Sequence, residues 1–490
     1  MGDDPPLCSP TLIGLLERYS THRHHLNYYN CVVTSAFYIH RAPNPNSPYT
    51  VDHLPLQLQP LIYGGLRTLI PQHPMLSVTI VNENTPKPYY SALDRIDLDK
   101  IIHIHSTEQN IDEIVQDELC RNFKQQAQVG GPNWRAVVVP GIEDNVSGFW
   151  VVFAFHHALT DGLGGFVFHK DLLRSLNSGD FDPKNQISSV VEVPKPKQLS
   201  PAMEDMYQIP LGLGYIFSAL RDEYLPFTAS PPENLWICGD SGNPLHVPPP
   251  PEGLRTELLT LQIPTELMIG VAMQTKEKGT RVTPLLEVIL SLAFLEVFPH
   301  SDSIRVSTVV SVRRWLSKQL ESYGGADNVL GTYTTQFRED FTRAAFDLSK
   351  PLPSIFSEAQ RARETIDKVL HSRGKNTGGG LLRFVTDFDS YFKSKMGQRR
   401  GDSLEVSNVG VFKTGAVANM DKWDIGDARF SQSANVTGPA VVCSIVSLES
   451  GAMALGFTWQ EGIVTKEEMG RVLETTKVLL QLVGSEGFRK

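Results

Sequence analysis

The first half of the chain alternates short apolar runs with amphipathic segments. Runs rich in β-branched and aromatic residues predict four strands, at residues 31–40, 75–82, 134–141 and 150–157. Two further segments carry apolar side chains three and four positions apart, which predicts helices at residues 54–70 and 166–176. A strand, a glycine-containing loop and a helix therefore follow one another from residue 150 to residue 176. We interpret the first half as a mixed α/β domain.

The second half repeats this alternation after a proline-rich segment. Residues 254–264 and 304–312 predict strands, and the apolar residues 283–298 predict a helix between them. Between the halves, prolines gather in VPKPKQLSP, SPPEN and VPPPPEG, and proline fits neither a helix interior nor the middle of a sheet. A chain of 490 residues is also too long for one hydrophobic core. We therefore expect two α/β domains, at 1–180 and 256–490, joined by a crossover at 181–255.

The charge and the cysteines narrow the class of protein. The net charge is −9, whereas a nucleic-acid-binding protein usually carries clustered positive charge, so nucleic acid is not expected as a partner. The five cysteines are scattered without a CxxC pair, which favours a reducing compartment and gives no zinc site. The acidic, proline-containing N-terminus does not resemble a secretion signal. We expect a cytoplasmic protein, with peripheral attachment to an internal membrane left open.

The most apolar long stretch, at residues 282–298, is the candidate for a transmembrane segment. It contains Glu287 and Glu296 and falls short of the ~18 uncharged residues that suggest a membrane span. We therefore predict a buried helix here and no transmembrane segment.

The clearest chemical motif is HHALTDG, at residues 156–162, directly after an apolar strand. The end of a strand exposes side chains while the sheet holds the backbone still, which suits a base that must meet a substrate proton. Neutral imidazole accepts a proton at about pH 7, so His157 is the candidate base. Asp161 either contacts this imidazole or sets the turn that aims it, and the glycines that follow relax the backbone. An isolated HxxxD is more often structural than catalytic. The longer pattern HHxxxDG after a hydrophobic strand therefore decides for a catalytic interpretation.

The pattern HHxxxDG on a hydrophobic strand resembles the signature of the chloramphenicol acetyltransferase-like superfamily. That superfamily includes plant BAHD acyltransferases, peptide-synthetase condensation domains and fungal alcohol acetyltransferases. Further segments resemble, in order, the fungal alcohol acetyltransferase family: LLERYSTHRHHLNYYNCVV, IPQHPMLSVTI, PNWRAVVV, VSVRRWL and VSNVGVF. The resemblance implies an α/β fold of two chloramphenicol acetyltransferase-like domains, with mixed sheets and an active-site tunnel at their interface.

The resemblance also implies roles for residues of the motif. His157 would act as the general base, and His156 would pack or hydrogen-bond beside it. Asp161 would turn away from the substrate and pair with an arginine of the other half, for which Arg313 fits best. A buried carboxylate paired with arginine would lock the loop rather than accept a proton.

A second group of site residues is expected in VSNVGVF. Ser407 and Asn408 match the strand that borders the tunnel in relatives, where a donor would stabilise the oxyanion of the reaction. The alternative is that SNVG is only a turn or bulge, with the backbone bending at Gly410. The two interpretations stand about equal on the sequence.

The reaction expected from the resemblance is transfer of an acetyl group from acetyl-CoA to the hydroxyl of an alcohol or a hydroxylated secondary metabolite. Acetyl-CoA would be a co-substrate, with no tightly bound cofactor and no metal. The run KSKMGQRRG supplies Lys395, Arg399 and Arg400, whose charges suit the phosphates of CoA, although such a run is more often a solvated loop. We expect a monomer. Two alternatives stay open: an enzyme that uses a carrier-protein thioester or an amine acceptor, and a non-catalytic binding protein.

Three other signals are interpreted structurally. GDSG at residues 239–242 mimics a serine-protease motif, but its proline-rich surroundings lack the short strands of such a fold, which argues against Ser241 as a nucleophile. The cluster of His22, His24 and His25 lacks a complementary ligand pair and is expected to cap a solvated helix. The amphipathic segment 474–490 is expected to pack on the domain rather than on a membrane.

Overall fold

The computed structural model describes residues 11–40, 54–143, 146–179, 187–194, 198–224, 234–347, 349–415 and 422–486. Contacts between residues divide the chain into two compact units. The first unit comprises Met1–Met206, Leu316–Tyr333 and Val411–Ser433. The second unit comprises Tyr207–Trp315, Thr334–Gly410 and Ala434–Lys490.

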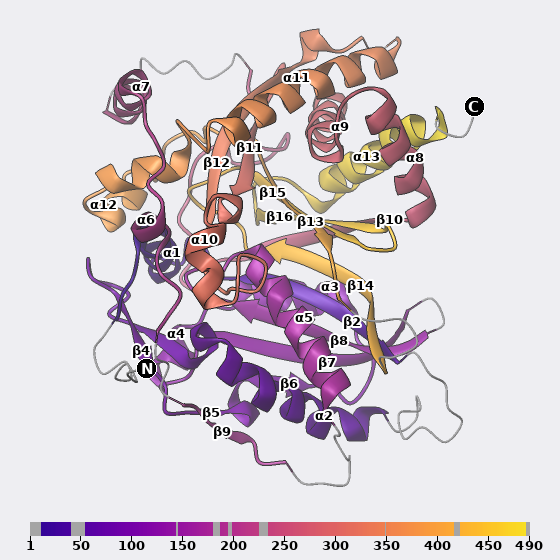
Figure 1. Ribbon diagram of the computed structural model, residues 1–490. Helices are drawn as coiled ribbons and strands as arrows, with labels where there is room; N and C mark the ends of the chain where they lie inside the picture. The colour runs from indigo at the N-terminus through magenta and orange to yellow at the C-terminus, as the bar shows by residue number, and fades with distance from the viewer. Residues whose placement is uncertain are drawn as a thin grey trace. The chain divides into compact units, whose positions relative to one another are not determined.

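The first unit is built on a mixed five-stranded sheet (Figure 1). Its strand order is β14 (Trp423–Gln432), β2 (Val32–His40), β8 (Val146–Phe155), β7 (Trp134–Glu143) and β6 (Ile102–Ile104). Neighbouring strands are antiparallel except for β6 and β7, which run parallel. β2 and β8 are rich in Val, Phe and Ala and are buried along most of their length, as expected for central strands covered on both faces.

Helices and two smaller sheets surround this sheet within the first unit. α5 (Gly162–Ser178) packs against α2 (Leu54–Leu69), β2 and β14, and α3 (Ile111–Cys120) contacts β2 and β8. The smaller sheets are β1 (Thr11–Leu12) with β4 (Tyr89–Ala92) and β3 (Val78–Val81), and β5 (Arg95–Asp97) with β9 (Val190–Glu192). The unit also contains α1 (Leu15–His25), α4 (Lys124–Gln128), α6 (Met203–Met206) and α10 (Ser317–Leu320).

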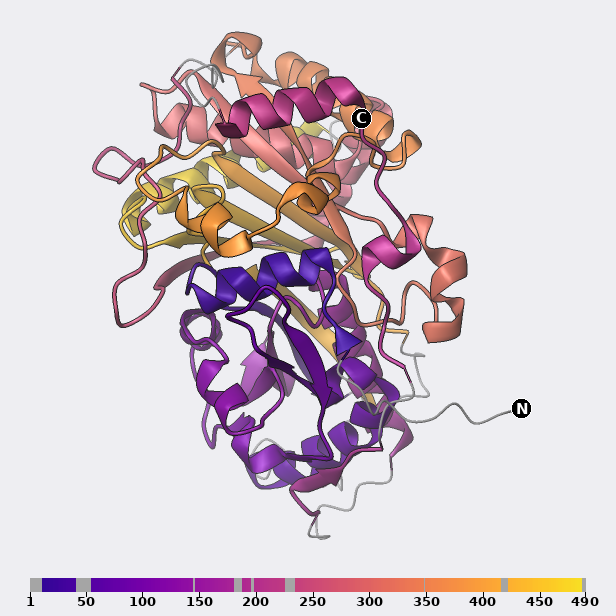
Figure 2. The same ribbon diagram turned by 90° about the vertical axis from the view of Figure 1, so that its left-hand side faces the viewer.

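The second unit has a mixed six-stranded sheet of its own. Its strand order is β10 (Thr256–Ile263), β16 (Met453–Gln460), β15 (Val441–Leu448), β13 (Leu404–Phe412), β11 (Ser303–Ser311) and β12 (Thr334–Thr342). β11 runs parallel to β13 and antiparallel to β12. The strands form a layer that is also visible in the turned view (Figure 2).

Four helices of the second unit pack together beside this sheet (Figure 1). They are α8 (Thr265–Glu277), α9 (Val282–Val297), α11 (Pro351–His371) and α13 (Lys466–Glu486). α7 (Leu213–Tyr224) and α12 (Phe388–Lys393) belong to the same unit. α13 contacts α8, α9 and β10, which confirms for residues 474–486 the prediction that the amphipathic C-terminal segment packs on the domain. Residues 487–490 of that segment lie outside the described residues.

α9 is the apolar stretch that the sequence offered as a membrane candidate, and it is a buried helix as predicted. Its one deeply buried acid, Glu287, accepts a hydrogen bond from Oγ1 of Thr308 in β11 over 2.7 Å. Burial raises the pKa of Glu287 to about 8, so this carboxyl is mostly protonated at about pH 7 and adds little charge to the core. No helix among the described residues has the length and apolar character needed to cross a membrane.

The predicted elements are present with shifted ends; β8, for example, ends at Phe155 rather than at residue 157. Two differences are larger. The predicted strand at 75–82 begins as a 3-10 helix, Pro74–Ser77, before β3 extends. Pro74 accounts for this, because its fixed φ angle suits the first turn of a helix. The proline-rich segment 181–255 contains the described helix α7 and strand β9, which the prolines did not indicate.

The two units also cross the predicted boundaries 1–180, 181–255 and 256–490. β14 lies in the predicted C-terminal domain, yet it pairs with β2 and belongs to the first unit. The segment 316–333 belongs to the first unit as well, and the predicted crossover divides after Met206. A strand that joins a distant sheet has the same local pattern as one that joins a nearby sheet, so the sequence gives no sign of this exchange.

Cysteine chemistry bears on the expected compartment. Cys31, Cys120, Cys238 and Cys443, the cysteines in the described part of the chain, are free thiols. Their state is compatible with a reducing environment, and the cytoplasmic location stays a prediction.

Candidate active site

The HHALTDG motif joins strand β8 to helix α5 in the first unit. β8 ends at Phe155, and α5 begins at Gly162. Asp161 is the N-cap of α5, where its Oδ1 accepts the backbone N–H of Gly164 over 3.0 Å. Aspartate is favoured at this position because its side chain satisfies an N–H that has no partner within the helix. The motif therefore contains a helix start as well as the candidate base.

Gly164 and Gly165 serve close packing rather than backbone freedom. A Cβ atom added to Gly164 would overlap Oγ1 of Thr160, and one added to Gly165 would lie 2.6 Å from Cγ2 of Thr34 in β2. Neither glycine has a positive φ angle. The prediction that these glycines relax the backbone is thus wrong. The missing side chain of Gly165 lets the first turn of α5 approach β2, and that of Gly164 leaves room for Thr160.

The segment 331–333, also in the first unit, holds the turn. Oγ1 of Thr332 donates to the carbonyl of His157 over 2.8 Å, and the N–H of Tyr333 donates to Oδ2 of Asp161 over 3.1 Å. The backbone N–H of Asp161 donates to the carbonyl of Gly331 over 3.3 Å. Both carboxylate oxygens of Asp161 therefore accept backbone N–H groups, which favours a role in setting the turn. The sequence around residues 331–333 carries no motif that could have indicated this contact.

His157 is partly buried beside Tyr29, with 5.9 Å between the two ring centres. Its Nδ1 is buried and makes no hydrogen bond of standard geometry with any described residue. Burial, followed by the positive charge of Arg23, lowers the pKa of His157 to about 4, although Asp161 acts in the opposite direction. The imidazole is therefore neutral at about pH 7, which is the form that can accept a proton.

His156 is buried in a hydrogen-bonded cluster with Glu83 and His24. Its Nδ1 accepts the backbone N–H of Ala158 over 2.9 Å, so the proton of the neutral ring is on Nε2, which donates to Oε1 of Glu83 over 2.9 Å. In His24, Nε2 accepts the N–H of Phe123 over 3.0 Å, which leaves Nδ1–H to donate to the same Oε1 over 2.8 Å. One carboxylate oxygen thus receives two imidazole N–H groups, an arrangement that the sequence did not indicate.

The protonation states of this cluster agree with its hydrogen bonds. Burial, and then the neighbouring His24, lowers the pKa of His156 to about 4, so its ring is neutral. Burial alone would raise the pKa of the Glu83 carboxyl, but His24 and His156 together hold it below its usual range. The cluster therefore places one carboxylate oxygen between two imidazole N–H groups, and the ring of His156 is neutral.

The same three side chains could in principle supply metal ligands, because their ligand atoms lie within 4.8 Å of one another. A metal would need lone pairs on Nδ1 of His24 and Nε2 of His156, which carry the protons in the hydrogen-bonded cluster. Because the other nitrogen of each ring accepts a backbone N–H, metal binding would require a deprotonated ring or the loss of that bond. The donor set fits the hydrogen-bonded cluster better than a metal site. That the reaction needs no metal stays a prediction.

The interpretation of His22, His24 and His25 as caps of a solvated helix is wrong for His22 and His24. Both are buried in α1. Apart from Leu15, Leu16 and Tyr19, α1 is polar, so its apolar spacing could not reveal the buried face. Its burial comes from residues distant in sequence, among them Glu83 and Phe123.

Arg313, Ser407 and Asn408 belong to the second unit. Arg313 is buried in a 3-10 helix, Arg313–Trp315, and Ser407 is buried in β13. The pairing of Asp161 with Arg313, the tunnel, and the contact of Ser407 and Asn408 with an oxyanion stay predictions.

Asn408 takes part in a local bend within β13. Its Oδ1 accepts the N–H of Gly410 over 2.8 Å, and its Nδ2 donates to Oγ1 of Thr283 over 3.1 Å. Gly410 has a φ angle of 80°, a conformation that favours glycine. SNVG lies within β13 rather than in a turn, and the bend at Gly410 is what the alternative interpretation expects.

The basic residues expected at the CoA phosphates are not equivalent. Arg399 is exposed, and Nζ of Lys395 lies 4.4 Å from the centre of the Tyr391 ring. Arg400 is 2% exposed, and its guanidinium donates to the carbonyls of Asn435 and Gly438 over 3.2 and 3.0 Å. A phosphate at Arg400 would compete with these bonds, so the structure supports a structural role for Arg400. Phosphate binding by Lys395 and Arg399 stays a prediction.

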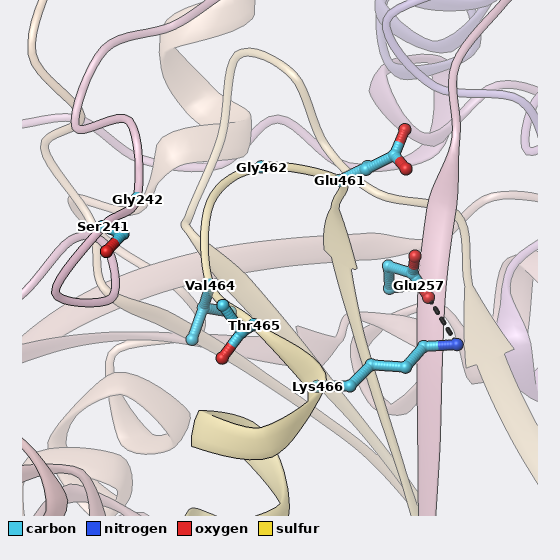
Figure 3. Close-up of a pocket in the computed structure, with 8 residues that line it drawn as sticks. All are labelled: Ser241, Gly242, Glu257, Glu461, Gly462, Val464, Thr465 and Lys466. Atoms are coloured by element: carbon cyan, nitrogen blue, oxygen red, sulfur yellow. Dashed lines mark ion pairs between the residues drawn. The ribbon is translucent and has the colours of Figure 1, made fainter.

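The GDSG segment borders a small pocket of about 210 Å³ in the second unit (Figure 3). Ser241 lines this pocket with Glu257 and Lys466, whose side chains form an ion pair of 2.7 Å. The lining residues include no histidine that could activate the Ser241 hydroxyl. The pocket agrees with the structural interpretation of GDSG.

The fold is shared with solved acyltransferases and condensation domains. The trichothecene 15-O-acetyltransferase TRI3 from Fusarium sporotrichioides aligns with 97% of this chain and 95% of its own, with a TM-score of 0.70 and 15% identity. The condensation domain of the monacolin K polyketide synthase MokA aligns with 98% of each chain, with a TM-score of 0.59 and 9% identity. The fold class is therefore the chloramphenicol acetyltransferase-like α/β fold, as predicted.

Sequence comparison identifies the family within this class. The profile of the alcohol acetyltransferase family matches residues 12–208 and 251–479. "Probable alcohol acetyltransferase crmB" from Aspergillus fumigatus is 29% identical over 479 residues, which cover 94% of this chain and 96% of the relative. "Probable alcohol acetyltransferase FCK4" from Fusarium pseudograminearum is 23% identical over 440 residues, 86% of each chain. The chain belongs to the alcohol acetyltransferase family and is an acyltransferase.

Proposed function

We propose that this protein transfers an acetyl group from acetyl-CoA to a hydroxyl of an alcohol or a hydroxylated secondary metabolite, with His157 as the general base. The observation that carries the proposal is the neutral, partly accessible His157 at the end of β8, held in place by its fixed neighbours. The family supports the reaction class, and the relatives named as alcohol acetyltransferases support an alcohol acceptor.

The chemistry needs no covalent intermediate on the protein. The imidazole of His157 removes the proton of the acceptor hydroxyl while the oxygen attacks the thioester carbonyl. The tetrahedral oxyanion then collapses, the carbon–sulfur bond breaks, and the imidazolium returns its proton to the departing CoA thiolate. Acceptor hydroxyl and acetyl-CoA thus become acetyl ester and CoA thiol, and His157 ends in its starting state.

Release of CoA thiol from acetyl-CoA by the purified protein tests this proposal, across a panel of alcohols and polycyclic hydroxy compounds. The expected result is thiol release that depends on the acceptor, together with a product whose mass has increased by one acetyl group. Release without any acceptor would indicate hydrolysis instead. No release from free acetyl-CoA, but transfer from an acetylated carrier protein, would support the condensation-type alternative and contradict the use of free CoA.

A further inference from the structure

Arg23 of α1 is a buried cation between two aromatic rings. Its side chain is 6% exposed, and its Cζ lies 4.4 Å from the ring centre of Tyr19 and 4.3 Å from that of Tyr29. Two such cation–π contacts restrict the orientation of the guanidinium. The N–H donors at the edge of the group are the part that can bind a partner.

At least one donor of Arg23 has no acceptor within the described part of the protein. Its Nε is buried and has no hydrogen-bond partner, and no carboxylate in the described residues pairs with the group. A buried charged donor without an acceptor is costly, because it has left water without gaining a replacement. A site of this kind favours a ligand that brings an anionic oxygen.

This cation lies next to the candidate base. The Tyr29 ring that stacks on Arg23 is also the ring 5.9 Å from the imidazole of His157, so one side chain connects the two groups. The positive charge of Arg23 helps to lower the pKa of His157, so His157 is a weak base while no anion is bound to Arg23. An acceptor that brings an anion to Arg23 would neutralise this charge and raise the pKa of His157.

We propose that Arg23 binds a carboxylate of the acceptor, so that the enzyme selects hydroxy compounds that carry an anionic oxygen close to the reacting hydroxyl. The proposal rests on the proposed function, because it takes His157 as the place of reaction. The phosphates of CoA are excluded as the ligand, since the long pantetheine arm separates them from a thioester that reacts at His157. Arg23 is then a specificity-determining residue.

A binding experiment without acetyl-CoA tests the site independently of turnover. The probes are 3-(hydroxymethyl)benzoate and its methyl ester, titrated by calorimetry into the full-length protein. The wild type should bind the carboxylate about tenfold to a hundredfold more tightly than the ester, as expected for a charge-assisted hydrogen bond in a dry site. Equal affinity for the two probes would overturn the proposal without any variant.

Variants then assign the preference to this residue. Arg23→Met should bind the acid and the ester with equal affinity. Arg23→Lys keeps the charge but cannot form a bidentate hydrogen bond with a carboxylate, so it should keep part of the preference for the acid. Should Arg23→Met fail to fold, Arg23→Lys carries the test. Arg95→Met, at an exposed arginine of β5 in the same unit, is the matched control and should behave as the wild type. Full acid preference in folded Arg23→Met would contradict the assignment.

Turnover separates this inference from the alternative that Arg23 stabilises the oxyanion of the reaction. If Arg23 binds the acceptor, Arg23→Met raises KM for the hydroxy acid and leaves KM for the ester unchanged. An equal loss of kcat for both acceptors would overturn acceptor binding in favour of the oxyanion. Acid-selective binding without any acetyl transfer would uphold the anion site and contradict the proposed function, so the two failures are distinguishable.

Discussion

The imidazole of His156 accepts the backbone N–H of Ala158 over 2.9 Å, so the residue before the candidate base closes the turn that follows it. The opposite side of that ring is fixed by Glu83, and the carbonyl of Ala158 accepts the hydroxyl of Tyr90 over 2.6 Å. The backbone around His157 is therefore held on both sides by groups that do not take part in proton transfer. His156 and Glu83 are positioning residues in this account.

Replacement of Glu83 tests this positioning. Glu83→Ala removes the acceptor of two imidazole N–H groups and should lower kcat by about tenfold. This corresponds to an increase in the activation free energy by about the worth of one hydrogen bond. KM for the acceptor should change little, because Glu83 does not contact the substrate in this account. Steady-state kinetics with one alcohol checks the result.

Glu83→Gln is the matched rescue variant. The Gln oxygen can still accept from His24 and His156, so most of kcat should return even though the charge is lost. A loss of activity as large as that of Glu83→Ala, or an effect confined to KM, would contradict the positioning role.

Asp161→Asn should reduce activity and stability together. An amide can accept with only one of its two polar atoms, so one of the bonds from Gly164 and Tyr333 is lost. We expect the free energy of unfolding to fall by about 1–2 kcal/mol and kcat to fall with it. Denaturant unfolding and kinetics on the same sample check both effects.

Asn110→Ala is the control for a lost helix cap, because Asn110 caps α3 of the same unit. This variant should lose a similar free energy of unfolding without losing kcat. Wild-type stability in an inactive Asp161→Asn protein would instead indicate a direct chemical role for Asp161.

The pH dependence of kcat/KM should report the lowered pKa of His157. Activity rises as the base loses its proton, so the acid limb should lie at about 4 rather than at the 6.5 of an ordinary histidine, with little change from about pH 5 to 7. Arg23→Met should move the limb upward, because it removes a positive charge that disfavours the imidazolium. A wild-type limb at 6.5, in protein shown by circular dichroism to be folded, would contradict a buried base.

Glu17 should make the protein less stable as the pH rises. Burial, and then the charge of Glu204, raises the pKa of Glu17 to about 8, so the native state keeps a proton that the unfolded chain has already lost. The contribution of protonated Glu17 to the free energy of unfolding is fully present below the pKa that Glu17 has in the unfolded chain. It is lost between about pH 5 and 8. Glu17→Gln should not lose stability over this pH range. At about pH 8 its free energy of unfolding should exceed that of the wild type by an amount on the order of a few kcal/mol.

The measurement is the difference in unfolding free energy between wild type and Glu17→Gln at both ends of that range. Glu108→Gln, at an exposed position of the same unit, should show no such pH-dependent difference. A wild type that gains stability from pH 5 to 8 relative to Glu17→Gln would reverse the sign and contradict the account.

The sequence was informative wherever the signal is local. β8, the turn and α5 follow from a run of apolar β-formers, the glycines after it and the apolar spacing of residues 166–176, and these elements place His157. The sequence also predicted the buried helix α9 correctly, because the acids in this otherwise apolar stretch argue against a transmembrane segment.

The rest depends on contacts between distant segments. Glu83, His24 and residues 331–333 hold the turn, but nothing in their own neighbourhoods distinguishes them from ordinary polar residues. The pairing of β14 with β2 changed the domain boundaries for the same reason. Apolar spacing in the sequence does not identify buried polar residues, such as Arg23 in α1.

The central claim, that His157 is the base, is tested most directly by the kcat of His157→Ala with acetyl-CoA and one accepted alcohol. We predict that kcat falls by roughly a hundredfold to ten-thousandfold, the usual contribution of a general base, while the thermal unfolding midpoint stays close to that of the wild type. Turnover near the wild-type rate in folded His157→Ala would contradict the mechanism.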